Sequence, residues 1–310
     1  MQKEQLLIQN FNTTKGDILD IPLTYQCFGL PLHTAPIVFV LHALTGNSNV
    51  AGEDGWWKDI VAEGKPLDTS HFTIICFNIP GNGYDNFFFS NDNKITTRDI
   101  ARLFILGLQQ LHVDNIDIMI GGSVGGAIGW TMLSEHPKLV KTFIPIATHY
   151  ETSDWLYAQC QIQEFLLEDQ ENGLEKARYH AMLCYRTPNS INHRFQNFRL
   201  DNNVRKSTDW LNYHGKALSK RFQYDAYKMV NHLLLTIENN KEDLENIEAE
   251  IHLIGIDSDL FFTPDDMKDT LNLNFKNKTK QYHEIVSEHG HDAFLMEYKQ
   301  LENILINILR

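Results

Sequence analysis

The chain has 310 residues, of which 43% are hydrophobic and 22% charged, and its formal net charge at pH 7 is −13. A chain of this length and apolar content can bury a full globular core, and it suits one large domain with an insertion better than several small modules. Its aromatic content and the absence of long biased tracts argue against disorder. The acidic balance argues against nucleic acid as a partner, because phosphate binding needs a basic surface. An anionic small molecule stays possible where Lys or Arg residues gather locally.

The cysteines and the N-terminus indicate the compartment. Cys27, Cys76, Cys160 and Cys184 are far apart and form no Cys-x-x-Cys pair. We interpret them as small apolar core residues in a reducing compartment. The N-terminus lacks the apolar segment of a secretory signal, and no stretch approaches the ~18 to 20 apolar residues that span a bilayer. The sequence thus predicts a cytoplasmic protein that has no membrane partner.

Short apolar, β-rich runs alternate with helical patterns along the chain. The runs are 37–41, 72–77, 116–120, 140–144 and 251–256. Several are almost continuously apolar, as expected of strands that helices cover on both faces. The alternation of strands and helices predicts an α/β fold with a mostly parallel central sheet flanked by helices.

The alternation breaks between residues 148 and 240, where the pattern is helical, as in 222–235. We therefore predict a core domain formed by residues 1–147 and 241–310, and a helical lid insertion formed by residues 148–240. Such an insertion would cap the carboxyl ends of the strands, where open α/β sheets bind their ligands. The chain is predicted to end in a helix over 297–309.

The run at 116–120 leads into Gly121-Gly122-Ser123-Val124-Gly125-Gly126 and then into a helical segment. Gly-x-Ser-x-Gly between a strand and a helix is the nucleophile-elbow pattern of the α/β-hydrolase fold. The turn strains the serine backbone, so the flanking glycines are needed for the strand and helix to pack closely. Ser123 is the candidate nucleophile, and the Val124 N–H can point at a developing oxyanion. The alternative is a glycine-rich turn that binds phosphate or only reverses the chain.

An acid and then a histidine follow the nucleophile in this fold. Asp257 and Asp259 come after the run at 251–256, and either could accept a hydrogen bond from an imidazole or cap the next helix. His289 and His291 follow the last strand-like run. Position alone separates neither pair.

A metal site is the alternative use of the segment 289–292, because two His and one Asp can bind Zn or Fe. No second cluster of comparable density accompanies it, although His42, His149 and His283 could be recruited. We therefore predict no metal.

Several motifs, taken in order, resemble the homoserine O-acetyltransferase family of α/β hydrolases. The resemblance covers nearly the whole chain and selects Asp259 over Asp257 and His291 over His289. The elbow departs from the family pattern, which more often has Met where Val124 stands. The motifs are His42-Ala43-Leu44-Thr45-Gly46 with Gly55-Trp56-Trp57, Gly64-Lys65-Pro66-Leu67-Asp68-Thr69, Asn78-Ile79-Pro80-Gly81, the elbow itself, Ser258-Asp259-Leu260-Phe261 and Gly290-His291-Asp292-Ala293-Phe294-Leu295.

The resemblance implies ping-pong acyl transfer in methionine biosynthesis. Ser123 would take an acetyl group from acetyl-CoA, which is a co-substrate and not a permanently bound cofactor, and the L-homoserine hydroxyl would then remove it. His291 would act as base and acid, with Asp259 behind it. The backbone N–H groups of Leu44 and Val124 would form the oxyanion hole.

The resemblance also implies residues that bind the amino acid. Arg178 and Tyr185 match positions that hold the homoserine carboxylate, and they lie seven residues apart, so a helix would place both on one face. Asp292 would take the ammonium group. A second matching segment, Lys220-Arg221-Phe222 with Tyr227, is interpreted as mainly structural. Family members commonly form homodimers through the helical insertion, and we expect the same here.

One departure leaves the acyl donor open. The loop at 83–90 is shorter than the family loop that helps to choose between acetyl and succinyl donors. The alternative function is an esterase or thioesterase on the same fold, with water as the acceptor. Three catalytic residues cannot distinguish transfer from hydrolysis; only acceptor binding and exclusion of water can.

Overall fold

The computed structural model describes residues 2–90, 94–277 and 279–309. Over these residues an eight-stranded sheet has the order β1-β2-β4-β3-β5-β6-β7-β8. β1 and β2 are antiparallel to their neighbours, and the strands from β4 to β8 in this order are parallel. The strands are β1 (Glu4–Asn12), β2 (Ile18–Gly29), β3 (Ile37–Leu41), β4 (Thr73–Phe77), β5 (Ile116–Gly122), β6 (Val140–Ile146), β7 (Glu250–Ile256) and β8 (Lys280–Ile285).

The prediction of a mostly parallel sheet flanked by helices is confirmed. The five apolar runs correspond to β3 through β7. The antiparallel pair β1 and β2 was not predicted, because β1 is solvent-exposed at most positions and carries polar residues among its apolar ones. Such a strand gives no continuous apolar run for a sequence pattern to detect.

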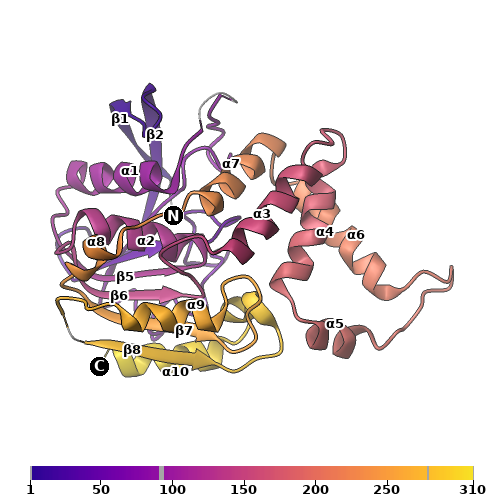
Figure 1. Cartoon of the computed structure of the whole chain (residues 1–310). Coiled ribbons are helices and arrows are strands. Elements are labelled where there is room, and N and C mark those ends of the chain that lie inside the picture. Colours follow the sequence, from indigo (N-terminus) through magenta and orange to yellow (C-terminus); the bar gives the residue numbers. More distant parts are fainter. Residues whose placement is uncertain (1, 91–93, 278, 310) are drawn as a thin grey trace.

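Helices cover both faces of the sheet (Figure 1). α1 (Thr97–Gln110), α2 (Val124–Glu135) and α8 (Lys241–Glu245) lie on one face, and α10 (Tyr298–Ile308) lies on the other. Alternate residues of β3 enter the two cores, with Phe39 on the α1 and α2 side and Val40 on the α10 side. This burial on both faces explains why the central strands read as continuous apolar runs.

Five helices lie between β6 and α8 in the chain, and the described residues there form no strand (Figure 1). They are α3 (Asp154–Leu166), α4 (Gly173–Tyr185), α5 (Pro188–Phe195), α6 (Lys206–Ser219) and α7 (Tyr224–Leu235). α4, α5 and α6 project away from the sheet as an arm. We keep 148–240 as the proposed limits of this helical insertion.

Three short elements follow β7 in the chain. They are α9 (Pro264–Asp269), η1 (Thr270–Asn272) and η2 (Gly290–Leu295), and η2 connects β8 to α10. Among the described helices, none has the length and apolar character needed to cross a membrane.

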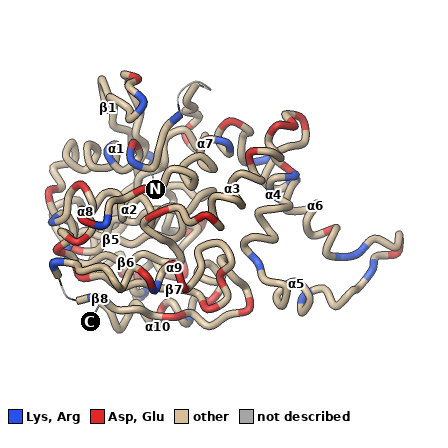
Figure 2. The backbone as a smooth tube through the Cα atoms, viewed as in Figure 1, with Lys and Arg blue, Asp and Glu red and all other residues tan. Residues whose placement is uncertain are grey.

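The helical insertion differs in charge from the rest of the chain. Residues 148–240 carry 11 Lys and Arg against 11 Asp and Glu, so the formal charge of −13 lies entirely on the remaining residues. Figure 2 shows basic residues recurring along the arm of α4, α5 and the segment before α6. The overall acidity therefore does not describe the field around this helical insertion.

Candidate active site

Ser123 stands at the turn between β5 and α2. Its backbone has φ 56 and ψ −131, a region that residues other than glycine rarely adopt. A Cβ at Gly125 would lie 2.3 Å from the Leu41 carbonyl oxygen, and one at Gly121 would lie 2.8 Å from the Leu41 Cβ. The glycines thus let α2 approach β3 closely while the serine keeps its strained conformation. This is the local geometry of a nucleophile elbow.

Two hydrogen bonds join Ser123, His291 and Asp259. Ser123 Oγ lies 2.9 Å from His291 Nε2, and His291 Nδ1 lies 2.7 Å from Asp259 Oδ2. All three residues are buried, with exposed fractions of 4%, 4% and 2%. A neutral imidazole that donates from Nδ1 to the carboxylate accepts the serine hydroxyl at Nε2, which is the arrangement of a base beside a nucleophile.

The Asp259 carboxylate and the His291 ring are both held in place. Asp259 Oδ1 accepts hydrogen bonds from the backbone N–H groups of Phe261 at 2.7 Å and Phe262 at 3.1 Å. The same two phenylalanine rings pack on the imidazole, with ring centroids 5.1 and 5.7 Å away, and Phe294 packs at 5.8 Å. An apolar wall around a fixed hydrogen-bonded pair excludes water and strengthens the electrostatic interactions inside it.

The other acid and histidine have different contacts. Asp257 is exposed, and its carboxylate accepts a hydrogen bond from the Ser287 N–H at 2.9 Å. His289 Nδ1 lies 2.9 Å from the Ser190 hydroxyl, so this ring faces the helical insertion. The structure thus brings Asp259 and His291 to Ser123 and brings neither Asp257 nor His289 there. Within the described residues no group of three His, Cys, Asp or Glu side chains is placed to hold a metal ion.

The backbone N–H groups expected in the oxyanion hole come from two elements. Val124 is the first residue of α2, so its N–H has no acceptor within the helix. Leu44 lies in the loop after β3 and lines the same cavity as Ser123. The helix N-terminus and this loop therefore flank the serine from two sides, as donors to a developing oxyanion must.

His42 holds the loop that contains Leu44. Its Nδ1 lies 2.8 Å from the Ala43 carbonyl oxygen, and its Nε2 accepts the Ile79 N–H at 2.9 Å. Burial lowers the pKa of His42 to about 4, so the ring is neutral at physiological pH, as these two hydrogen bonds require. The motif residue His42 thus supports the loop and does not face the cavity.

A cavity of about 300 Å³ opens on Ser123 and His291. α4 contributes both Arg178 and Tyr185 to its wall, so the residues predicted to share a helix face do so. The Arg178 guanidinium carbon lies 5.8 Å from the centre of the Tyr185 ring, which in turn lies 5.6 Å from the His291 ring. Burial raises the pKa of Tyr185 well above its usual range, so its hydroxyl stays protonated.

Asp292 also lines this cavity, but it is paired with an arginine that the sequence analysis did not assign to the site. Arg186 Nε donates to Asp292 Oδ2 at 2.8 Å, and the two side chains are 13% and 22% exposed. Arg221, interpreted from sequence as mainly structural, lines the cavity as well. One sequence signal could have identified Arg186 as a site residue, namely its position directly after Tyr185 in a segment that matches the family.

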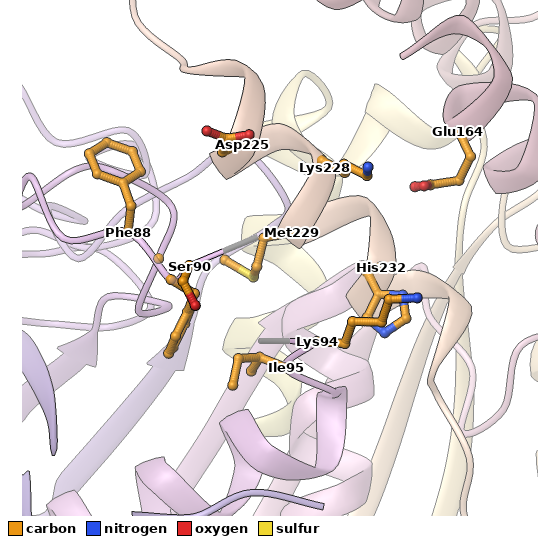
Figure 3. Close-up of a pocket in the computed structure, with 11 residues that line it drawn as sticks. Phe88, Ser90, Lys94, Ile95, Glu164, Asp225, Lys228, Met229 and His232 are labelled. Carbon is orange, nitrogen blue, oxygen red and sulfur yellow. The ribbon is translucent and has the colours of Figure 1, made fainter. Parts of the chain in front are cut away.

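A second cavity, of about 210 Å³, lies between α7 and residues from the ranges 81–90 and 94–95 (Figure 3). Phe88 comes from the short loop, Met229 and His232 from α7, and Glu164 from α3. Neither Ser123 nor His291 lines it. The shortened loop at 83–90 therefore packs against α7 and contributes no wall to the Ser123 cavity.

Comparison with known proteins places this site in a family. The family model for the alpha/beta hydrolase fold matches residues 36–298. The homoserine O-acetyltransferase of Deinococcus radiodurans is 30% identical to this chain over 91% of the chain and 84% of the relative. The chain belongs to the homoserine O-acetyltransferase family of α/β hydrolases. It is thus an enzyme of an acyltransferase family.

Solved structures agree on the architecture. The homoserine O-acetyltransferase from Staphylococcus aureus is 25% identical, with a TM-score of 0.87 over 100% of this chain and 95% of that one. Esterase E22 is 17% identical, with a TM-score of 0.88 over 100% of both chains. At that identity the esterase shares the fold alone. The homoserine O-acetyltransferase family and esterases thus build on one scaffold.

We predict that His42 makes the protein less stable as the pH falls from 8 to 5. The pKa of His42 is about 4 when folded against 6.5 for an unperturbed histidine, so the unfolded chain binds the proton more readily between these values. The contribution of neutral His42 to the free energy of unfolding is complete above pH 6.5 and is lost as the pH falls toward 4. Between pH 8 and pH 5 the free energy of unfolding should fall by about 2 kcal/mol. The measurement is the free energy of unfolding in urea at both pH values.

The comparison needs two variants. His42→Gln should lack this part of the pH dependence, whereas His136→Gln, at an exposed histidine, should keep it. An unaltered pH dependence in His42→Gln would contradict the assigned role.

Proposed function

We propose that this chain transfers an acyl group from acetyl-CoA to the hydroxyl of L-homoserine through an acyl-Ser123 intermediate, in methionine biosynthesis. The observation that carries this proposal is the hydrogen-bonded chain from Ser123 through His291 to Asp259, opening on a cavity lined by arginines. Membership in the homoserine O-acetyltransferase family supports the choice of acceptor.

In the first half-reaction Ser123 Oγ attacks the thioester carbonyl. His291 Nε2, 2.9 Å away, takes the hydroxyl proton as the new C–O bond forms, and Asp259 stabilises the imidazolium. The N–H groups of Leu44 and Val124 donate to the oxyanion of the tetrahedral intermediate. Collapse of this intermediate breaks the C–S bond, His291 returns its proton to the CoA sulfur, and acyl-Ser123 remains.

In the second half-reaction the homoserine hydroxyl takes the place of the serine hydroxyl. His291 removes its proton as its oxygen attacks the acyl carbonyl, and the same N–H groups hold the second oxyanion. Breakdown of the intermediate releases O-acyl-homoserine and returns the proton to Ser123 Oγ. The phenylalanine rings around His291 disfavour water as the competing acceptor.

The acceptor would be held by residues from the helical insertion and from η2. Arg178 can bind the homoserine carboxylate, and the protonated Tyr185 hydroxyl can donate to it. Asp292 is the proposed partner of the ammonium group, which would share this carboxylate with Arg186 at 2.8 Å. Since Arg186 already neutralises Asp292, the cavity keeps an excess of positive charge that favours a substrate carrying a carboxylate.

Hydrolysis is the second candidate function. Its support is the shared architecture of esterase E22 and of the acetyl esterase MekB, which has a TM-score of 0.83. The arginines in the cavity favour transfer, because a simple esterase needs no site for an amino-acid acceptor. Succinyl-CoA is the alternative donor. The loop at 83–90, which corresponds to the family loop that helps to choose the donor, lines no part of the Ser123 cavity and therefore does not decide between the two.

A thiol-release assay distinguishes transfer from hydrolysis. We predict that CoA release from acetyl-CoA requires L-homoserine and exceeds release from succinyl-CoA, because acyl-Ser123 turns over only when the acceptor hydroxyl is in place. Ser123→Ala should release no CoA and show no acetyl adduct in intact-mass spectra. Equal release without homoserine would support an esterase or thioesterase, and an adduct on Ser123→Ala would remove Ser123 from its role.

Arg178→Ala should raise the homoserine KM by about 10- to 100-fold, which corresponds to the loss of one charge-assisted hydrogen-bonded pair. Acylation by acetyl-CoA should change little, since that half-reaction precedes acceptor binding. Lys176→Ala is the matched control, because Lys176 is on the same helix but pairs with Asp169 outside the cavity. Steady-state kinetics at saturating acetyl-CoA give the KM, and an unaltered value would remove Arg178 from the acceptor site.

We also propose a homodimer formed through the helical insertion. Exposed apolar side chains gather there, including Ile162 at 42% and Phe165 at 63% on α3, and Tyr213 at 67% on α6. A second copy that covers them would remove this apolar surface from water. Light scattering after size exclusion should give twice the chain mass, and Phe165→Asp should give a monomer while Leu7→Asp on β1 should not. A monomeric wild type would refute the dimer.

A further inference from the structure

We infer that Arg221 is a positioning residue that couples the helical insertion to the oxyanion loop, which we define as residues 42–47. Arg221 lies between α6 and α7. Its Nη1 donates to the Thr45 carbonyl oxygen at 3.1 Å, and its Nη2 lies 3.4 Å from Thr45 Oγ1. Thr45 directly follows Leu44, whose N–H is a proposed oxyanion donor. The inference therefore rests on the proposed acylation of Ser123.

The remaining tethers of the oxyanion loop come from the core. The His42 ring holds its start through Ala43 and Ile79, and Gly46 accepts a hydrogen bond from Asn82 Nδ2 at 3.3 Å. Trp56 Nε1 donates to the carbonyl oxygen of Asn47 at 2.9 Å. These contacts hold the loop at its two ends and leave Leu44 and Thr45 at its crest.

Only Arg221 ties the crest of the loop to the helical insertion by hydrogen bonds, within the part of the chain that the structure describes. The bond to the Thr45 carbonyl fixes a peptide plane two units after the one that carries the Leu44 N–H. Rotation of the crest is therefore opposed from outside by the insertion and from inside by the core. The direction of the Leu44 N–H thus depends on where the insertion sits.

The guanidinium group is the side chain that suits this position. Its planar fork can donate to the carbonyl and the hydroxyl of Thr45 at once, which a single lysine ammonium does less well. Arg221 is solvent-exposed and shares the lining of the cavity with Arg178, so two like charges face the same space and repel each other. The two contacts with Thr45 oppose that repulsion and keep Arg221 directed at the loop.

Removal of Arg221 should weaken binding of the transition state more than binding of the ground state. Removal of Arg221 leaves the loop attached at both ends, so the ground-state cavity survives, but the Leu44 N–H is free to turn away from the oxyanion. An oxyanion donor matters only once the charge develops. The loss should therefore fall on both half-reactions, the acylation of Ser123 and the deacylation of acyl-Ser123, and acylation can be measured alone.

The test measures acylation of Ser123 by p-nitrophenyl acetate in single-turnover experiments, which need no homoserine. Arg221→Ala should acylate about 10- to 100-fold more slowly than wild type, and Arg221→Lys should recover only part of the rate. Added guanidinium chloride at millimolar concentration should partly rescue Arg221→Ala. Lys220→Ala, which removes an equal charge from the exposed neighbouring residue, should acylate at the wild-type rate.

Two further readouts separate positioning from a general structural role. The affinity for phenylboronic acid, which forms a tetrahedral adduct on the serine oxygen, should fall in Arg221→Ala by the same factor as the acylation rate. The thermal midpoint should stay within about 2 °C of wild type. Should Arg221→Ala fold poorly, the partial loss in Arg221→Lys carries the same comparison.

The inference would be overturned if Arg221→Ala were acylated at the wild-type rate, or if Lys220→Ala lost as much of the acylation rate as Arg221→Ala. A loss of rate with no loss of boronate affinity would overturn it too. If the wild type itself forms no acyl-Ser123, the proposed function fails together with this inference. If the wild type is acylated but homoserine is no acceptor, only the proposed function fails.

Discussion

The close approach of α2 to β3 is the constraint on which the rest of the site depends. A side chain at Gly125 would collide with the Leu41 carbonyl oxygen at 2.3 Å, so only glycine allows the turn that holds Ser123 in its strained conformation. The turn aims the hydroxyl at the carboxyl edge of the sheet and places the start of α2 behind it. The histidine, the carboxylate and the N–H donors then need only to reach this one point.

The histidine and the carboxylate reach Ser123 because parallel strands end at the same edge of the sheet. Asp259 follows β7 and His291 follows β8, and these strands are paired neighbours in the sheet. The two loops are also bonded to each other, since Asp257 accepts the Ser287 N–H and Ser258 Oγ accepts the Gly290 N–H. The acid and the histidine are thus placed as one unit, and the residues that are not at the site, Asp257 among them, help to build it.

The helical insertion supplies the arginines of the cavity, which the elbow, the histidine and the acid do not provide. Three residues in a hydrogen-bonded chain can serve an esterase or an acyltransferase equally well. The arginines on the insertion add positive charge to a protein whose other residues carry the whole net charge of −13. The proposed recognition of the acceptor carboxylate is therefore a local property, and the contacts of Arg186 with Asp292 and of Arg221 with Thr45 connect the cavity wall to residues beside the reacting atoms.

The sequence by itself determined the parallel sheet, the elbow and the helical character of the segment between residues 148 and 240. These features depend on neighbours a few residues apart, namely apolar runs, glycines at fixed spacing and helical periodicity. Position alone left the choices between Asp257 and Asp259 and between His289 and His291 open, and only the family resemblance selected one of each. The exposed β1 strand left no pattern to detect.

Only the tertiary structure decided which of these side chains meet. The Asp259–His291 pair spans 32 residues, Arg186–Asp292 spans 106, Ser123–His291 spans 168 and Arg221–Thr45 spans 176. No periodic pattern reports a contact at such separation, because the contact is set by how the sheet orders its strands and where the insertion packs. Arg221, interpreted from the sequence as mainly structural, lines the cavity for that reason.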